Sequence, residues 1–207
     1  TVDADESARK SLEEELRIVQ DLQHPHIVTY LGHRRVGTTI QIYLEYCSSG
    51  SMASLLAEFG PLEERMLSRA TAGMLRGLAY LHDHKPCVLH RDIKGGNLLV
   101  THGFKVKLAD FGCSKRAFES RSFRTVGSLP WMAPEVIRQT NGYGRKADIW
   151  SAGCTVIEMA TGEKPWGSNA FNNMAAAMMR IGLSEDTPPL PESAPAALRD
   201  FLAPSRA

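Results

Sequence analysis

The sequence predicts an α+β fold in which a small part, with one helix and about two strands, precedes a larger and mostly helical part. Residues 7–22 carry apolar side chains at helical spacing, and two β-branched and aromatic runs follow at 27–31 and 40–46. From residue 51 onward the longer segments again show helical periodicity. A chain of 207 residues is long enough to bury a sizeable core as one domain.

The first helix is expected to end at the dipeptide His24-Pro25, because the residue before a proline is disfavoured in a helix. The two β-rich runs that follow are separated by a polar segment, 34–39, which contains Gly37. This arrangement predicts an antiparallel strand pair. The apolar residues that mark the helix are Leu12, Leu16, Val19 and Leu22.

Two helices are predicted next, one ending near Phe59 and a longer one opening at Gly60-Pro61. Short apolar runs then stand among Gly, Asp and Asn, a pattern typical of brief strands that hold a polar loop between them. Further helices are predicted at 148–161 and 172–181. The apolar face of the long helix comprises Met66, Met74, Leu75, Leu78 and Leu81, and the brief strands are 88–89, 98–100 and 106–108.

Charge and composition exclude several classes of protein. Lys and Arg total 24 against 23 Asp and Glu, so no global field favours nucleic acid or an anionic membrane. The four cysteines lie far apart, unlike a zinc site or a disulfide scaffold. No apolar run suits a signal peptide or a membrane span. We therefore expect a cytoplasmic protein with free thiols, no membrane span and no nucleic-acid partner.

Three motifs follow one another in the second half of the chain. They are VLHRDIKGGNLLV (88–100), LADFGCSK (108–115) and WMAPEVI (131–137). A single Asp or Asn among glycines is usually a turn former. In this order, however, the motifs resemble the catalytic loop, the DFG element and the APE element of eukaryotic protein kinases. The resemblance implies a protein kinase-like two-lobe fold, with a partial small lobe at 1–46 and a truncated large lobe at 47–207.

The resemblance also implies catalytic roles and the cofactors ATP and Mg²⁺. Asp92 would accept a hydrogen bond, and finally the proton, from the substrate hydroxyl, and Lys94 would steady the transferred phosphate. Asn97 and Asp110 would hold magnesium, which prefers hard oxygen ligands. Two other residues match structural positions of the family: His90, packed near the phenylalanine of DFG, and Asp148, which anchors the backbone of the catalytic loop.

The segment YLEYCSSGSM (43–52) resembles the hinge between kinase lobes. Leu44 would be the gatekeeper, the backbone of Glu45 and Cys47 would face adenine, and Leu99 would form the floor of the pocket. Taken without the catalytic loop, the same segment would be read as an edge strand running into a helix.

Glu15 stands nine residues before His24, the spacing of the kinase helix glutamate that pairs with a strand lysine at the nucleotide site. That lysine, like the glycine-rich phosphate loop, would lie before Thr1. Two interpretations therefore stay open. The chain is a piece of an active kinase, or it is a truncated, inactive kinase-like module that binds or regulates partner proteins. The intact set Asp92, Lys94, Asn97 and Asp110 favours the active kinase.

A lysine two residues after Asp92 resembles serine/threonine kinases, and Ser128 stands where those kinases carry the threonine that contacts Asp92 and Lys94. Several phrases look like MAP kinase kinase kinases of the MEKK type, which implies a MAP kinase kinase as substrate. The competing family is the tyrosine kinase-like serine/threonine group, which shares a WMAPE phrase. The MEKK-like phrases are LEYCSSGSMASLLAEFGPL, LRGLAYLH, HRDIKGGNLLV, KLADFGCSKR, GEKPW and PPLPES.

The activation segment carries candidate regulatory residues. Arg91 would place a guanidinium where a phosphate on that segment could be captured by paired hydrogen bonds. Our hypothesis is that phosphorylation of Ser122 or Thr125, with Ser120 as a further acceptor, raises activity. The alternative is a solvated polar loop. Cys113, next to DFG, is a weaker candidate for a nucleotide-site thiol.

Overall fold

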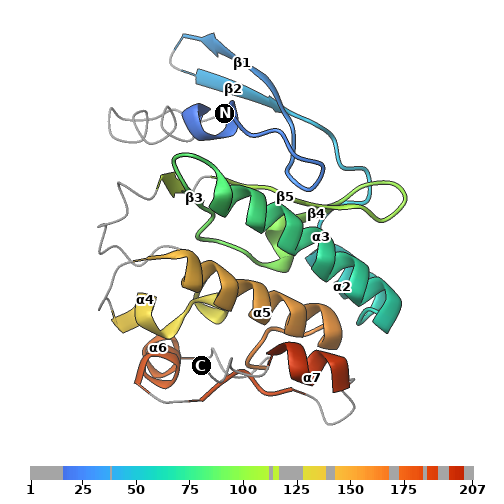
Figure 1. The fold of residues 1–207 in the computed structure, drawn as a ribbon, viewed down its shortest axis with the longest axis vertical. Coiled ribbons are helices and arrows are strands. Elements are labelled where there is room, and N and C mark those ends of the chain that lie inside the picture. Colours follow the sequence, from blue (N-terminus) through green and yellow to red (C-terminus); the bar gives the residue numbers. More distant parts are fainter. Residues whose placement is uncertain are drawn as a thin grey trace.

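The computed structural model describes residues 16–37, 39–111, 114–116, 128–138, 143–167, 173–183, 186–190 and 196–202. An antiparallel hairpin, β1 (Tyr30–Val36) and β2 (Thr39–Leu44), lies at one end of the molecule beside the end of the first helix, and the later helices lie toward the other end (Figure 1). The mixed helix and strand content confirms the predicted α+β fold. The division at residues 46 and 47 stays a prediction.

The hairpin differs from the prediction in its extent. The predicted strand 27–31 was too early and the predicted turn 34–39 too long, because pairing continues to Val36↔Thr39. Ile27 is buried and forms a parallel bridge with Leu108 outside the hairpin. The apolar side chain of Ile27 therefore packs against the larger part of the molecule and does not belong to a hairpin strand. Most of the hairpin is exposed, and its residues are strand because their backbones pair with each other.

The first helix is described only at its end. Residues 16–19 are helical and a turn follows at 20–21, so the helix ends before His24 and not at it. Leu16, Val19 and Leu22 are buried, as their spacing predicts. The earlier part of the predicted helix, 7–15, lies outside the described residues.

Helix α2 (Met52–Phe59) begins at Ser51, whose hydroxyl accepts a hydrogen bond from the Ser54 backbone N–H at 3.1 Å. It ends at Gly60, which has a φ of 80°. Helix α3 (Glu64–Asp83) follows and is completely buried at Met74 and Leu81. The predicted Met66 and Leu75 are only half-buried, because the buried face is centred on Leu67, Ala70, Met74, Leu78 and Leu81.

The brief strands have the predicted boundaries: β3 (Val88–Leu89), β4 (Leu98–Val100) and β5 (Val106–Leu108). Strand β4 pairs with β5, and β3 pairs with β6 (Lys115–Arg116), both antiparallel. The polar loop between β3 and β4 ends in a short 3-10 helix, η1 (Gly95–Asn97). Strands β3 and β4 thus hold the two ends of the loop that carries the predicted catalytic residues.

The remaining described helices cover the other side of this loop. Helix α5 lies between α3 and the lower helices α4 and α6 (Figure 1). It is buried along most of its length, which explains the long apolar stretch that predicted it. The elements are η3 (Leu129–Trp131), α4 (Pro134–Arg138), α5 (Arg145–Thr161), α6 (Met174–Leu183) and α7 (Ala196–Leu202).

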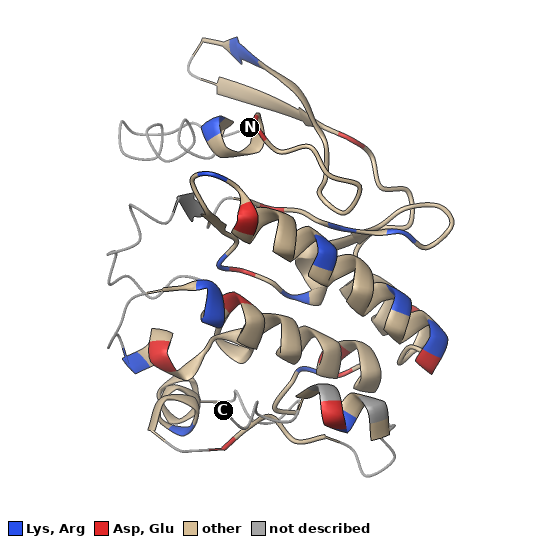
Figure 2. Ribbon diagram, viewed as in Figure 1, with Lys and Arg blue, Asp and Glu red and all other residues tan. Residues whose placement is uncertain are grey.

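Figure 2 shows basic and acidic residues spread over the helices and strands, as expected for a net charge of +1. Cys47, Cys87 and Cys154 are free thiols. Within the part of the chain that the structure describes, no helix is both long enough and apolar enough to cross a membrane.

Candidate active site

The loop between β3 and β4 is anchored on Asp148 of α5, which is completely buried. Its Oδ2 accepts the backbone N–H of His90 at 3.0 Å and lies 2.8 Å from Nε2 of His82. Its Oδ1 accepts the backbone N–H of Arg91 and the hydroxyl of Tyr143, both at 2.9 Å. This is the anchoring contact that the motif resemblance implies for Asp148.

Burial acts to raise the pKa of Asp148, but hydrogen bonds from His82 and from the backbone of Arg91 and His90 outweigh it. The pKa therefore lies below its usual range, and the anchor is ionised at neutral pH.

Arg91 has a backbone φ of 72°, a conformation that residues other than glycine rarely adopt. Its side chain is buried, and the guanidinium carbon lies 5.4 Å from the centre of the Tyr143 ring. Because Asp148 binds both the Arg91 backbone and the Tyr143 hydroxyl, one carboxylate stabilises this turn and the ring beneath the guanidinium.

Asp92 is the centre of a cluster of polar side chains. Its Oδ2 lies 2.7 Å from Nζ of Lys94 and accepts Nδ2 of Asn97 at 2.9 Å. Its Oδ1 accepts the backbone N–H of Ser128 at 2.9 Å, and Lys94 donates to the Ser128 hydroxyl at 2.7 Å. The predicted contact of Ser128 with both residues is present, but its hydroxyl meets Lys94 and its backbone meets Asp92.

Burial acts to raise the pKa of Asp92. Hydrogen bonds from Lys94 and Ser128, the charge of Lys94 and a hydrogen bond from Asn97 act in the opposite direction and outweigh burial. The net effect is a pKa below the usual range. Asp92 is therefore an ionised hydrogen-bond acceptor at neutral pH and a weak base.

His90 is fully buried and packs on Phe111, with ring centres 5.2 Å apart. One ring nitrogen lies 3.2 Å from the Ala109 carbonyl oxygen. Burial lowers the pKa of His90, so the ring is neutral and serves as packing. The interpretation of His90 as a scaffold residue and not a base fits this geometry.

Asn97 and Asp110, the predicted magnesium ligands, are brought together by the backbone. The Ala109 N–H donates to the Asn97 carbonyl at 2.9 Å, which places the following Asp110 beside η1. Asp110 is exposed and has a φ of 62°. Because the amide nitrogen of Asn97 donates to Asp92, the amide oxygen is the Asn97 atom that can serve as a hard ligand.

A carboxylate and an amide oxygen fit Mg²⁺, which commonly binds one or two protein ligands together with phosphate oxygens and water. Among the described residues, no three His, Cys, Asp or Glu side chains are grouped so that they could hold a metal ion by themselves.

The predicted hinge residues lie where β2 leaves the hairpin. Cys47 is buried with Val28 and Ala109, and Leu99 packs against this group, so the predicted floor and hinge are neighbours. Leu44, the predicted gatekeeper, is 45% exposed.

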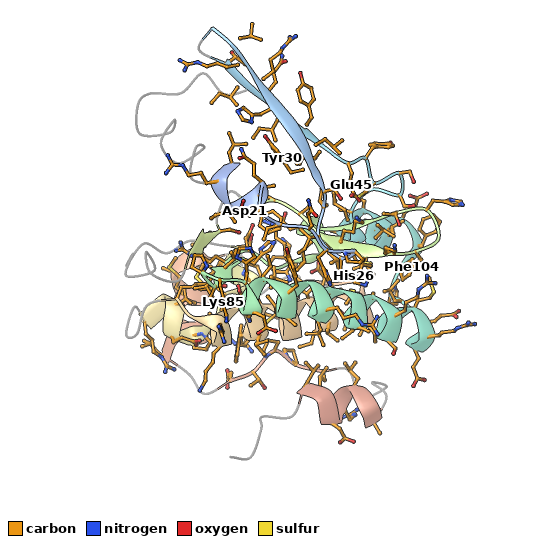
Figure 3. The ribbon with its side chains drawn as sticks, turned by 45° about the horizontal axis from the view of Figure 1, so that its top comes forward. Asp21, His26, Tyr30, Glu45, Lys85 and Phe104 are labelled. Carbon is orange, nitrogen blue, oxygen red and sulfur yellow. The ribbon has the colours of Figure 1, made fainter. Side chains whose placement is uncertain are left out.

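The backbone N–H of Glu45 is bonded to the Thr29 carbonyl at 2.9 Å, which leaves its carbonyl oxygen as the backbone group that can face a ligand. Its carboxylate lies 2.6 Å from Nζ of the buried Lys107. Glu45 thus links the end of the hairpin to β5, on which Lys107 lies. In the same region, His26 lies against α3, next to Gly73 and Gly77 (Figure 3).

Five of the predicted residues lie outside the described residues: Glu15, Cys113, Ser120, Ser122 and Thr125. Their roles stay predictions. Two residues that the sequence interpretation did not single out contribute to the site, Tyr143 beneath Arg91 and Glu158 beneath the catalytic loop. Glu158 had a signal, since it is a carboxylate inside the apolar run TVIEMA.

Comparison with known proteins agrees with this geometry. Residues 1–204 match the family described as protein kinase domain. The chain is 46% identical over 197 residues to mitogen-activated protein kinase kinase kinase ANP1 of Arabidopsis thaliana, covering 93% of this chain and 29% of that protein. It is 44% identical to mitogen-activated protein kinase kinase kinase 19 of Mus musculus, covering 96% of this chain and 15% of that protein.

Mitogen-activated protein kinase kinase kinase A of Dictyostelium discoideum is 41% identical, with 93% of this chain and 20% of that protein covered. A fold of this kind, with an Asp-Lys-Asn loop anchored on a buried helix, is that of a protein kinase domain. The chain belongs to the protein kinase domain family, and its resemblance to MAP kinase kinase kinases is confirmed. It spans less than a third of the length of the curated relatives named here.

Proposed function

We propose that this chain is the catalytic part of a serine/threonine protein kinase that transfers the γ-phosphoryl group of ATP to a MAP kinase kinase. The observation that carries the proposal is the cluster in which Asp92, Lys94, Asn97 and Ser128 are joined by direct hydrogen bonds. The names of the relatives support the substrate class, because each is called a mitogen-activated protein kinase kinase kinase.

In the proposed reaction, Asp92 orients the attacking hydroxyl. Its Oδ1 accepts a hydrogen bond from the Ser128 backbone N–H, and a carboxylate oxygen can accept a second. The hydroxyl oxygen forms the new bond to the γ-phosphorus while the bond to the β-phosphate oxygen breaks and ADP leaves. Because its pKa is low, Asp92 holds the hydroxyl in line and receives the proton late.

Lys94 has a position that suits both substrates. Its ammonium lies between Asp92 and the Ser128 hydroxyl and is partly exposed, so it can also reach a phosphate oxygen. Asn97 and Asp110 would hold Mg²⁺, which when bound supplies neutralisation of phosphate charge. Leu44, Glu45, Cys47 and Leu99 are proposed to border adenine, with Glu15 as the further nucleotide-site residue.

For regulation, we propose that Arg91 captures a phosphate on Ser122, Thr125 or Ser120. The support is its position: the guanidinium is packed over Tyr143 directly before Asp92, so an anion bound there would act on the catalytic loop. A full-length Ser122→Ala, Thr125→Ala double variant is expected to lose stimulated activity. An undiminished rate would contradict this part of the proposal.

The catalytic proposal is tested with the full-length protein, ATP and Mg²⁺, and a recombinant MAP kinase kinase, with phosphorylated residues identified by mass spectrometry. Asp92→Asn is expected to lower kcat by about 10²- to 10⁴-fold, the usual contribution of a positioned proton acceptor. Asp83→Asn, at the exposed end of α3, is the matched control and should keep the wild-type rate.

The outcomes separate the parts of the proposal. Phosphorylation of other proteins on Ser or Thr, with no MAP kinase kinase modified, would remove the substrate class and keep the chemistry. Absence of any phosphoryl transfer by the wild-type protein would contradict the enzymatic function and favour the inactive, partner-binding alternative.

A further inference from the structure

Glu158 of α5 holds the far end of the catalytic loop. It is 7% exposed, and its Oε2 accepts the backbone N–H of Gly95 at 2.9 Å. The other end of the loop is held by Asp148, ten residues earlier on the same helix, through His90 and Arg91. The proposed catalytic residues Asp92 and Lys94 therefore lie between two carboxylates of one helix.

The loop between the two anchors is similar in length to the stretch of α5 that it follows. Ten residues advance an α-helix by about 15 Å, and the four residues from Arg91 to Gly95 span at most about 14 Å when extended. Lys94 is extended, with φ −166° and ψ 165°. The backbone that enters Gly95 is thus extended at Lys94, so the position of Gly95 affects where Lys94 lies.

Gly95 is fitted closely to Glu158. A Cβ at this position would lie 2.6 Å from Oε1 and 2.8 Å from the carboxyl carbon of Glu158. The residue here must therefore lack a side chain, for reasons of space, and must supply an N–H. The next glycine differs, because a Cβ on Gly96 would meet only the Lys94 side chain, at an ordinary 3.5 Å.

The same oxygen of Glu158 also binds the segment next to the substrate. Oε2 accepts the indole N–H of Trp131 at 2.9 Å, and Ser151 of α5 donates to the Trp131 carbonyl at 2.8 Å. Trp131 is three residues after Ser128, whose hydroxyl accepts from Lys94. One carboxylate oxygen thus connects the catalytic loop, through Gly95, with the segment that carries Ser128.

We propose that Glu158 is a positioning residue for phosphoryl transfer, which fixes Gly95 and Trp131 on one carboxylate oxygen and so sets Lys94 and Asp92 relative to the Ser128 segment. The inference rests on the proposed kinase function. It concerns the rate of transfer and not the binding of nucleotide, because neither Gly95 nor Trp131 belongs to the proposed adenine pocket.

The test uses the full-length protein and compares Gly95→Ala with the matched Gly96→Ala. Gly95→Ala is expected to lower kcat by about 10- to 100-fold, the scale for a displacement of about 1 Å near the chemistry, with KM for ATP within about threefold. Gly96→Ala should stay near the wild-type rate. Equal rates for the two alanine variants, or a loss confined to KM for ATP, would overturn the proposal.

Glu158→Ala and Glu158→Gln provide the second comparison. The amide oxygen of glutamine can replace Oε2 as acceptor for both donors, so Glu158→Gln should keep most of kcat while Glu158→Ala loses it. Equal kcat values for these two variants would contradict the positioning role.

A third measurement does not depend on activity. The Gly95 amide should exchange its hydrogen faster in Glu158→Ala than in the wild type, and unchanged exchange would overturn the inference even if the wild-type protein transferred no phosphate. A wild-type protein that is inactive but protects this amide would contradict the kinase function alone.

Discussion

Replacing Asp148 is expected to destabilise the fold and the catalytic loop together. Four donors converge on this buried carboxylate: the backbone N–H groups of His90 and Arg91, Nε2 of His82 and the hydroxyl of Tyr143. Asp148→Ala leaves all four without this acceptor. Each buried donor left unsatisfied costs about 1–3 kcal/mol, and because the costs of donors in one network do not simply add, we expect the lower part of their sum, about 3–5 kcal/mol in total.

We therefore expect Asp148→Ala to lower the free energy of unfolding by about 3–5 kcal/mol, a large part of the ~5–15 kcal/mol typical of a domain. Asp148→Asn restores the volume but turns an NH₂ group toward two of the four donors, so it should recover less than half of the loss. Urea unfolding followed by tryptophan fluorescence measures these values, with Asp83→Ala at an exposed position as control.

The pH dependence gives a second check on the same residue. The pKa of Asp148 is depressed in the folded protein, so its contribution is present above the unfolded value of about 3.9 and is lost as pH falls through the folded value. The difference between wild type and Asp148→Ala should accordingly narrow below about pH 4. A variant within 1 kcal/mol of wild type at neutral pH, with unchanged kcat, would refute the anchoring argument.

Three further predictions concern other contacts. Burial raises the pKa of Glu158, so its ionisation opposes folding as pH rises above the unfolded value of about 4.3, and Glu158→Gln should gain stability relative to wild type between pH 4 and 7 in thermal unfolding. A Cβ on Gly77 would lie 2.8 Å from the His26 carbonyl oxygen, so Gly77→Ala should lower the free energy of unfolding in urea by about 1–3 kcal/mol. A Cβ on Gly153 would lie no closer than 3.4 Å to its nearest neighbour, a Leu202 methyl group, so Gly153→Ala should raise that free energy by up to about 1 kcal/mol. Ser128→Ala removes the acceptor of Lys94 and should lower kcat about 10- to 100-fold, while Ser128→Thr keeps the hydroxyl and most of the rate in steady-state phosphorylation assays.

The elements that the sequence predicted well are those that can be recognised from the residues next to them in the chain. Strands β3, β4 and β5 have the predicted boundaries because each is a short run rich in Val and Leu that adjoins a polar residue: His90 after β3, Asn97 before β4 and Lys105 before β5. The hairpin was placed less accurately, since its exposed residues are strand only through their partners across the pair. Ile27 looked like hairpin but bridges Leu108, a contact between distant residues that no local pattern contains.

The candidate site shows the same division. Asp92, Lys94 and Asn97 lie in one short motif, so their clustering follows from local sequence. Predicting that Ser128 joins this cluster also required the order of the three motifs along the chain. Residue types could not show that the Ser128 backbone N–H, and not its hydroxyl, donates to Asp92. Glu158 lies 63 residues from its partner Gly95, and only the packing of α5 against the loop brings them together.

The two carboxylates of α5 differ in what they contribute to the fold. Asp148 has donors on both oxygens, and these outweigh the cost of burial, so its pKa falls. Glu158 has both donors on one oxygen, and burial prevails, so its pKa rises. Glutamine at position 158 would keep an acceptor for both donors and would avoid the cost of a buried charge, so stability alone would favour glutamine there. Stability therefore accounts for Asp148 but not for Glu158, whereas the position of Gly95 and Trp131 relative to Lys94 gives Glu158 a role that the rate of phosphoryl transfer and the hydrogen exchange of the Gly95 amide would report.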